Sequence, residues 1–174
     1  DPRRLDIDIS RRISRLNRDT RFSKDKSPYS PLFRIHLSPS GPQPIPCDLF
    51  LCLTAETLLV GGGLFASMFS EATALVRQAI LDQADEFDRL IHNQEFAVCL
   101  PIRGESLKRV PKPFPADHPL ADYLKMKSWY LEQTVELGES NAALIEHMIA
   151  LAKSMQPFND FLNKALADFT MPQR

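Results

Sequence analysis

The sequence has few cysteines, and they follow neither a disulfide nor a metal-binding pattern. Its 174 residues include three, Cys47, Cys52 and Cys99. A small and odd number excludes a scaffold held together by disulfides. Cys47 and Cys52 lie close together, but no cluster of His or Cys follows that would complete a zinc site. We therefore expect reduced, mostly buried thiols, no metal and no cofactor.

Long apolar runs are also missing. A membrane-spanning helix needs roughly 20 consecutive apolar residues, and the runs here are only a few residues long. The chain starts Asp-Pro-Arg-Arg and lacks the apolar centre of a signal peptide. Hydrophobic residues make up 44% and charged residues 25%, as in ordinary globular proteins. We expect a cytoplasmic protein without membrane contact, folded as one domain over residues 1–174.

The net charge of −1 conceals an uneven distribution along the chain. Residues 1–34 contain ten Arg or Lys and five acids, whereas residues 35–100 contain two bases and eight acids. A second basic segment, 103–127, has six Arg or Lys and three acids. Such asymmetry is typical either of a surface for anionic partners or of two merely solvated segments.

Alternating apolar residues predict several strands. Residues 32–37 place Phe33, Ile35 and Leu37 on one face, and residues 13–22 alternate more loosely. Two short runs, 48–54 and 57–60, form a predicted hairpin with both faces apolar, which indicates central strands covered on each side. Another strand is predicted over residues 129–137. The three glycines 61–63 could form a phosphate-binding loop or a bend in the chain. A phosphate-binding loop requires a helix directly after it with a Lys at a set spacing, and neither follows here. The glycines therefore predict a bulge or sharp bend at a strand end.

Helical periodicity starts at Ser70, the expected N-cap, and continues to Ile91 as one long amphipathic helix. A short helix is predicted from His118, and Ser140 is expected to cap another. Pro157 is expected to end that helix, with a second one following it. Strands, helices, a strand and helices in this order predict an α+β fold with a mostly antiparallel sheet packed against helices.

The densest polar stretch lies between Arg15 and Tyr29. Guanidinium groups bind phosphate or carboxylate oxygens two at a time, and lysines add point charges. The same stretch could instead hold an ion-pair network of Arg15, Asp19 and Arg21, which fixes the local conformation and binds nothing.

This stretch also resembles the signature of a bacterial family, the domain-of-unknown-function family 2461. Its Arg-x-x-Arg-Asp-x-Arg-Phe pattern, followed by Lys and Tyr, matches residues 15–29. Further similarity lies in residues 60–64, 107–114, 117–119 and 125–128, so the resemblance extends from about Arg15 to Leu166. It implies no established reaction, because the family has none.

Three differences from the family pattern stand out. The N-terminal helical segment usual in the family is expected to be absent. Residues 52–56 read Cys-Leu-Thr-Ala-Glu where His-Leu-Glu-Pro-Gly is usual, so a His and a Glu with acid–base roles elsewhere would be lost here. Pro113 replaces a usual Gly and stiffens its loop.

We predict an uncharacterised protein that binds a small phosphate- or carboxylate-bearing ligand where the two basic segments converge in one groove. The predicted ligand-binding residues are Arg15, Arg18, Asp19, Arg21, Lys24, Lys26, Tyr29, Lys108, Lys112 and Lys127. One alternative is an enzyme acting on a phosphorylated or nucleotide-like substrate, with His36, Asp19, Tyr29 or a lysine as acid or base. Another is a module that binds nucleic acid or protein, although a sequence pI of about 6.5 is low for a nucleic-acid binder.

Overall fold

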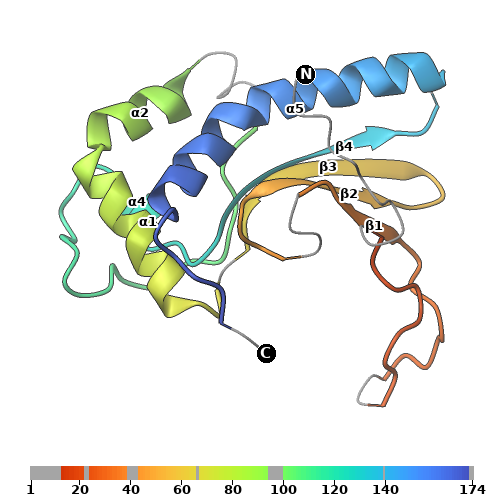
Figure 1. Ribbon diagram of the computed structural model, residues 1–174, viewed down its shortest axis with the longest axis horizontal. Helices are drawn as coiled ribbons and strands as arrows, with labels where there is room; N and C mark the ends of the chain where they lie inside the picture. Colours follow the sequence, from red (N-terminus) through yellow and green to blue (C-terminus); the bar gives the residue numbers. More distant parts are fainter. Residues whose placement is uncertain are drawn as a thin grey trace.

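Four antiparallel strands, arranged in sequence order, form the central sheet of the protein (Figure 1). The computed structural model describes residues 13–21, 24–38, 43–65, 67–93, 100–138 and 140–172. The strands are β1 (Phe33–His36), β2 (Asp48–Leu53), β3 (Thr57–Leu64) and β4 (Trp129–Glu136). Between β3 and β4 the chain forms α1 (Ser70–Asp82), α2 (Ala84–His92) and α4 (Ala121–Leu124), and α5 (Asn141–Ala165) follows β4. The predicted α+β fold with an antiparallel sheet is confirmed.

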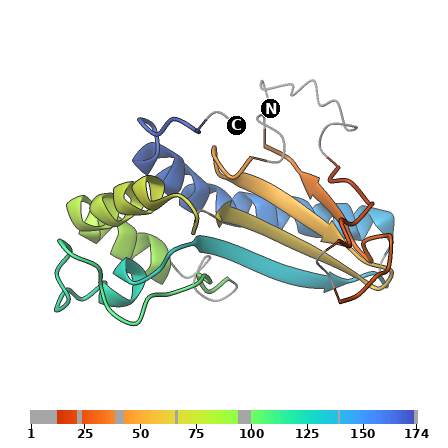
Figure 2. The same cartoon turned by 90° about the horizontal axis from the view of Figure 1, so that it is seen from below.

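The sheet is covered by helix on one face. α5 lies along this face, and α1 and α2 pack against α5 near the end of the sheet where β3 finishes (Figure 1). Alternate residues Leu58 and Val60 of β3 and Leu131 of β4 are buried on the α5 side. The opposite face, turned to the viewer in Figure 2, carries half-buried Phe50 and Cys52, and no helix of the described residues lies over it. Among the described residues, helices thus cover one of the two faces of the central strands, where cover on both was expected.

The glycines 61–63 lie inside β3, where a bulge or bend at the strand end was predicted. Gly63 has φ +127°, and a Cβ there would come within 2.4 Å of the Trp129 carbonyl oxygen on β4. A Cβ on Gly61 would meet the Phe50 ring at 2.2 Å, so this ring lies directly over the glycine. Glycine is needed here for close packing within the sheet.

The predicted long helix is two helices, α1 and α2. The break is at Gln83, whose φ of −124° and ψ of 40° leave the helical region. The change of direction lets Phe87 of α2 pack against Phe161 of α5, with ring centroids 5.2 Å apart. Ser70 is the first residue of α1 and Phe69 holds the N-cap position. The N-cap thus lies one residue before the predicted one.

Pro157 does not divide the C-terminal helix, as predicted, because α5 continues through it from Asn141 to Ala165. Burial of Phe158 and Leu162, both fully enclosed in the core, favours continuing the helix despite the lost backbone donor. The predicted cap is confirmed, since the Ser140 hydroxyl accepts a bond from the Ala143 amide at 3.3 Å.

The remaining expectations are met in part. The short helix α4 starts at Ala121, three residues after the predicted start; His118 Nδ1 accepts a bond from the Leu120 amide at 3.1 Å, as a turn residue would. The loosely alternating segment 13–22 contributes isolated bridges at Ile13 and Asn17, not a strand, and Phe22 lies outside the described residues.

Candidate functional site

The register of the sheet determines where the two basic segments lie. Phe33 at the start of β1 pairs with Leu53, and Thr57 pairs with Glu136, which places residues 15–29 beyond this end of the sheet. The opposite end has Leu64 paired with Trp129, and Arg103 is bridged to the neighbouring Tyr130. Because β4 is eight residues long, the ends are about 25 Å apart.

The predicted convergence of both segments in one groove is therefore wrong. Residues 15–29 project from the sheet on one side of the molecule, and residues 103–127 lie on the other side in both views (Figures 1 and 2). A small ligand cannot contact both sets of side chains at once.

In the first segment, two of the three predicted arginines, Arg18 and Arg21, already have carboxylate partners. Arg18 donates to Asp25, and Arg21 Nη2 donates to Asp19 at 2.6 Å. The hydrogen bond from Arg18 lowers the pKa of Asp25 to about 2, and that from Arg21 lowers the pKa of Asp19. The ion-pair alternative is thus what the structure shows for Asp19 and Arg21, without Arg15 as a third member.

The other predicted residues of this segment are exposed. Lys26 Nζ donates to the Thr20 carbonyl at 2.8 Å, whereas Arg15 and Lys24 make no ion pair with a described residue. Tyr29 is bridged to Asn17 through the backbone, and its ring is 65% exposed. These side chains lie on a projecting surface and line none of the three hollows described below.

In the second segment, Lys127 and Lys112 differ in their surroundings. Lys127 Nζ is 2.9 Å from Glu105 Oε2, so its charge is compensated. Lys108 and Lys112 are exposed and make no ion pair with a described residue. Lys112 alone of the three lines a hollow, which lies between α1 and the loop 111–114.

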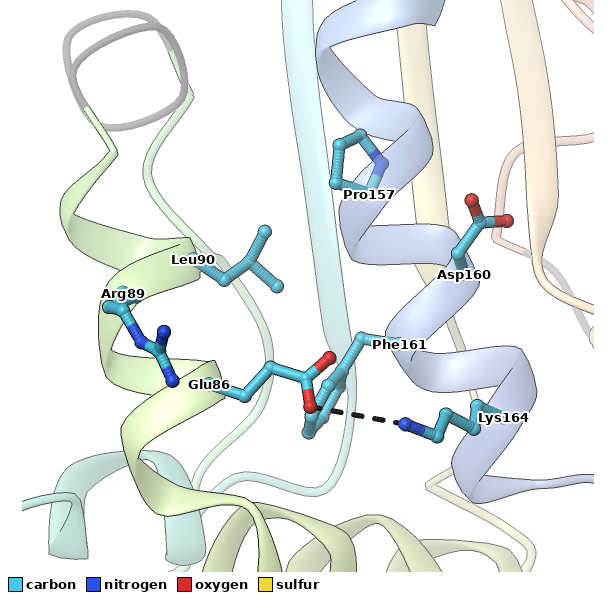
Figure 3. Close-up of a pocket in the computed structure, with 7 residues that line it drawn as sticks. All are labelled: Glu86, Arg89, Leu90, Pro157, Asp160, Phe161 and Lys164. Atoms are coloured by element: carbon cyan, nitrogen blue, oxygen red, sulfur yellow. Dashed lines mark ion pairs between the residues drawn. The ribbon is translucent and has the colours of Figure 1, made fainter.

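Three hollows in the described part of the chain differ in the charges that line them. The first, about 370 Å³ between α2 and α5, has an apolar wall of Leu90, Pro157 and Phe161. Figure 3 shows Glu86 and Lys164 facing one another across it, 3.9 Å apart, and Arg89 and Asp160 complete a balanced set of charges.

The second hollow, about 500 Å³ beside α4, has one cation and one anion, Arg103 and Asp122. The third, also about 500 Å³, is lined by Arg77 and Lys112 against a single acid, Glu71. Of the three, it alone has an excess of positive charge, and we call it the α1 hollow.

Arg77 gives the α1 hollow its unusual electrostatics. Its side chain is 6% exposed, and its donors bind the Leu124 carbonyl at 2.8 Å and the Met126 carbonyl at 2.7 Å. Nη1 donates to the Thr73 hydroxyl at 3.2 Å. These bonds use three of the five N–H groups of a guanidinium, and no carboxylate of a described residue pairs with it.

Aromatic rings surround the same guanidinium. Its central carbon lies 6.0 Å from the centre of the Phe114 ring and 5.8 Å from that of Trp129. Ring faces and carbonyl oxygens stabilise a cation without neutralising it. Burial lowers the pKa of Arg77, but an arginine stays protonated at neutral pH. The α1 hollow therefore has a positive charge at its wall that no residue described here neutralises.

No local sequence pattern marks Arg77 as a site residue, because its carbonyl partners are 47 and 49 residues away along the chain. One feature of the sequence does point to Arg77, its place in the helical pattern of α1. Thr73, Val76, Arg77 and Ile80 occupy the buried face of α1, and an arginine on such a face must have polar partners.

The side chains predicted as acid or base in the enzyme alternative do not lie together in one site. His36 lies on the open face of the sheet, where burial and then Arg34 lower its pKa. Asp19 and Tyr29 lie in the projecting segment. Cys47 and Cys52 are free thiols; burial raises the pKa of Cys47 to about 12, and Cys99 lies outside the described residues.

The described residues contain neither a group of side chains suited to a metal ion nor a helix suited to a membrane. No three or more His, Cys, Asp or Glu side chains are grouped so that they could hold a metal ion. Nor does this part of the chain contain a helix with the length and apolar character needed to cross a membrane.

Fold and site together define an α+β protein with an antiparallel meander, one helix-covered face and a positively charged hollow beside α1. A family model described as "Conserved hypothetical protein (DUF2461)" matches residues 1–161, so the chain belongs to this family of uncharacterised proteins. No curated protein and no solved structure matches it.

Proposed function

We propose that the protein binds a small anionic ligand, carrying a phosphate or carboxylate group, in the α1 hollow. The observation that carries this proposal is the buried guanidinium of Arg77, which has no carboxylate partner among the described residues. Buried charges in proteins are usually paired, because an uncompensated ion is costly to desolvate. An anion entering the α1 hollow would supply the missing charge.

Other groups that line the hollow suit the same ligand. Lys112 contributes a second cation at the rim, and Ser70 and Gln78 add a hydroxyl and an amide group, whereas the Thr73 hydroxyl already donates to the Ser70 carbonyl at 2.8 Å. Phe114 and two prolines form an apolar wall that would accommodate the carbon part of the ligand. Glu71 opposes anion binding, so the two rim charges have opposite predicted effects.

The test is isothermal titration of the protein with inorganic phosphate and with citrate at low salt. Lys112→Gln should weaken binding about fivefold, the effect of removing one partly exposed charge contact. Glu71→Gln should strengthen it by a similar factor. Lys153→Gln, an exposed lysine on α5, changes the net charge as Lys112→Gln does and should have no effect.

Lys112→Gln and Glu71→Gln are expected to change the affinity in opposite directions. A folding defect would lower the affinity in both variants, so it cannot produce the expected pattern. Unchanged affinity in both rim variants would refute the proposed site, as would weakening by Lys153→Gln equal to that by Lys112→Gln. A wild-type protein that binds neither anion would refute binding of these two anion classes altogether.

A further inference from the structure

The projecting segment, residues 13–21 and 24–32, is a paired ribbon, which we call the arm. Its two sides are joined by the bridge between Asn17 and Tyr29 and by backbone bonds at both sides of it. The Arg18 amide donates to the Pro28 carbonyl at 2.9 Å, and the Ser30 amide to the Leu16 carbonyl at 2.7 Å. In Figure 1 the arm extends away from the sheet and from all labelled helices.

The arm carries an excess of positive charge. Its sequence has five basic and two acidic residues, Asp19 and Asp25. Both acids form ion pairs within the arm, Asp25 with Arg18 and Asp19 with Arg21. The charges of Arg15, Lys24 and Lys26 are therefore left without a carboxylate among the described residues and face the solvent.

Exposed apolar side chains are concentrated in the same place. Tyr29 is 65% exposed, Leu16 36% and Ile13 38%, and Phe33 at the base of the arm is 45% exposed. They make up four of the ten large hydrophobic side chains that are exposed in the described part of the chain. Single exposed apolar residues are ordinary, but a group of them beside unpaired cations indicates a binding surface.

We infer that the arm is a binding surface for single-stranded nucleic acid. Lysines and arginines contact phosphates, and an exposed aromatic ring stacks on an unpaired base, with about 1–3 kcal/mol per base. The arm projects, so a base can lie flat on the Tyr29 ring without entering a pocket. Bases within a duplex are already stacked and cannot reach this ring, which distinguishes the two forms of nucleic acid.

This inference is independent of the α1 hollow, which lies at the other end of the sheet. It is tested by fluorescence anisotropy of a labelled thymidine oligonucleotide of about 20 nucleotides, over a series of salt concentrations. Tyr29→Ala should weaken binding at least fivefold and leave the salt dependence unchanged. Arg15→Gln with Lys24→Gln should weaken binding and reduce the slope of log K against log salt by about 2.

Matched controls lie away from the arm. Phe65→Ala removes an aromatic ring that is 44% exposed, and Lys153→Gln removes an exposed lysine; both should bind like the wild type. Circular dichroism confirms that each variant is folded. Absence of binding at low salt would overturn the inference, as would an unaltered affinity of folded Tyr29→Ala. Equal binding of duplex DNA, polyglutamate or phosphatidylserine vesicles would also overturn it, because it would show unselective attraction to anions.

Discussion

Arginines at the two ends of the sheet are held in different ways. In the arm, Arg18 and Arg21 are paired with acids that lie two to seven residues away, at the surface. At the other end, Arg77 is buried among carbonyl groups and aromatic rings, and no carboxylate of a described residue pairs with it. Exposed pairs contribute little to stability, whereas removing one member of a buried charged network is strongly destabilising. The segment with the denser arginine sequence is thus not the one that holds a buried arginine without a described carboxylate partner.

The largest expected effect concerns stability. Arg77→Met should lower the free energy of unfolding by about 3 kcal/mol, because the Leu124 and Met126 carbonyls lose their donors inside the protein. Arg18→Gln in the arm should leave the thermal midpoint nearly unchanged. Urea denaturation of both variants measures the difference. Equal stability of the two variants would contradict the assignment of different roles to the two ends.

Hydrogen exchange gives the second comparison. The amides of Arg103 and Tyr130, bonded to each other's carbonyls at 2.8 and 3.0 Å, lie next to the helix-covered core. The amides of Arg18 and Ser30 are bonded across the arm, which has little buried apolar surface. Arm amides should exchange at least ~100-fold faster, through local opening. Similar protection would show that the arm is as stable as the sheet.

The ion pair in the arm predicts a smaller, pH-dependent effect. The pKa of Asp25 is about 2 in the folded protein, below its usual 3.8, chiefly because of the bond from Arg18. A carboxyl group with a lowered pKa stabilises the fold above its usual pKa, and this contribution is lost as the pH falls towards 2. Carboxyl ¹³C chemical shifts recorded between these values should follow Asp25. In Arg18→Gln its pKa should return towards 3.8; titration near the usual value in the wild type would mean that the pair does not persist in solution.

The smallest effect is expected for the signature arginines on anion binding. Arg18→Gln with Arg21→Gln should change the affinity for inorganic phosphate less than twofold, because neither residue lines the α1 hollow. The measurement is the same titration used for Lys112→Gln. A loss of binding in the arm variant would move the anion site to the arm.

Local patterns in the sequence predicted much of the fold. Alternation gave β1 and β4, and a short apolar run gave β2, each within a residue or two; the cap at Ser140 was recognised from its position before a helical stripe. The sequence could not reveal the break at Gln83 or the continuity of α5 through Pro157. Both depend on packing between α2 and α5, where Phe87 meets Phe161.

The site was harder to predict than the fold. Spacing shows which basic residues are neighbours along the chain, but the register of four strands decides which are neighbours in space. Lys112 was among the predicted residues, whereas Arg77 was not, since its carbonyl partners come from the segment around α4. The ion pairs of Arg18 and Arg21 were foreseeable because their acids are close in sequence.

The most direct test of the uncompensated charge at Arg77 is an anomalous difference map from crystals grown in sodium bromide. Bromide should give a peak in the α1 hollow, within hydrogen-bonding distance of the Arg77 guanidinium or the Lys112 ammonium group. A map with no peak there, or with a carboxylate of the chain itself bound to Arg77, would contradict the account.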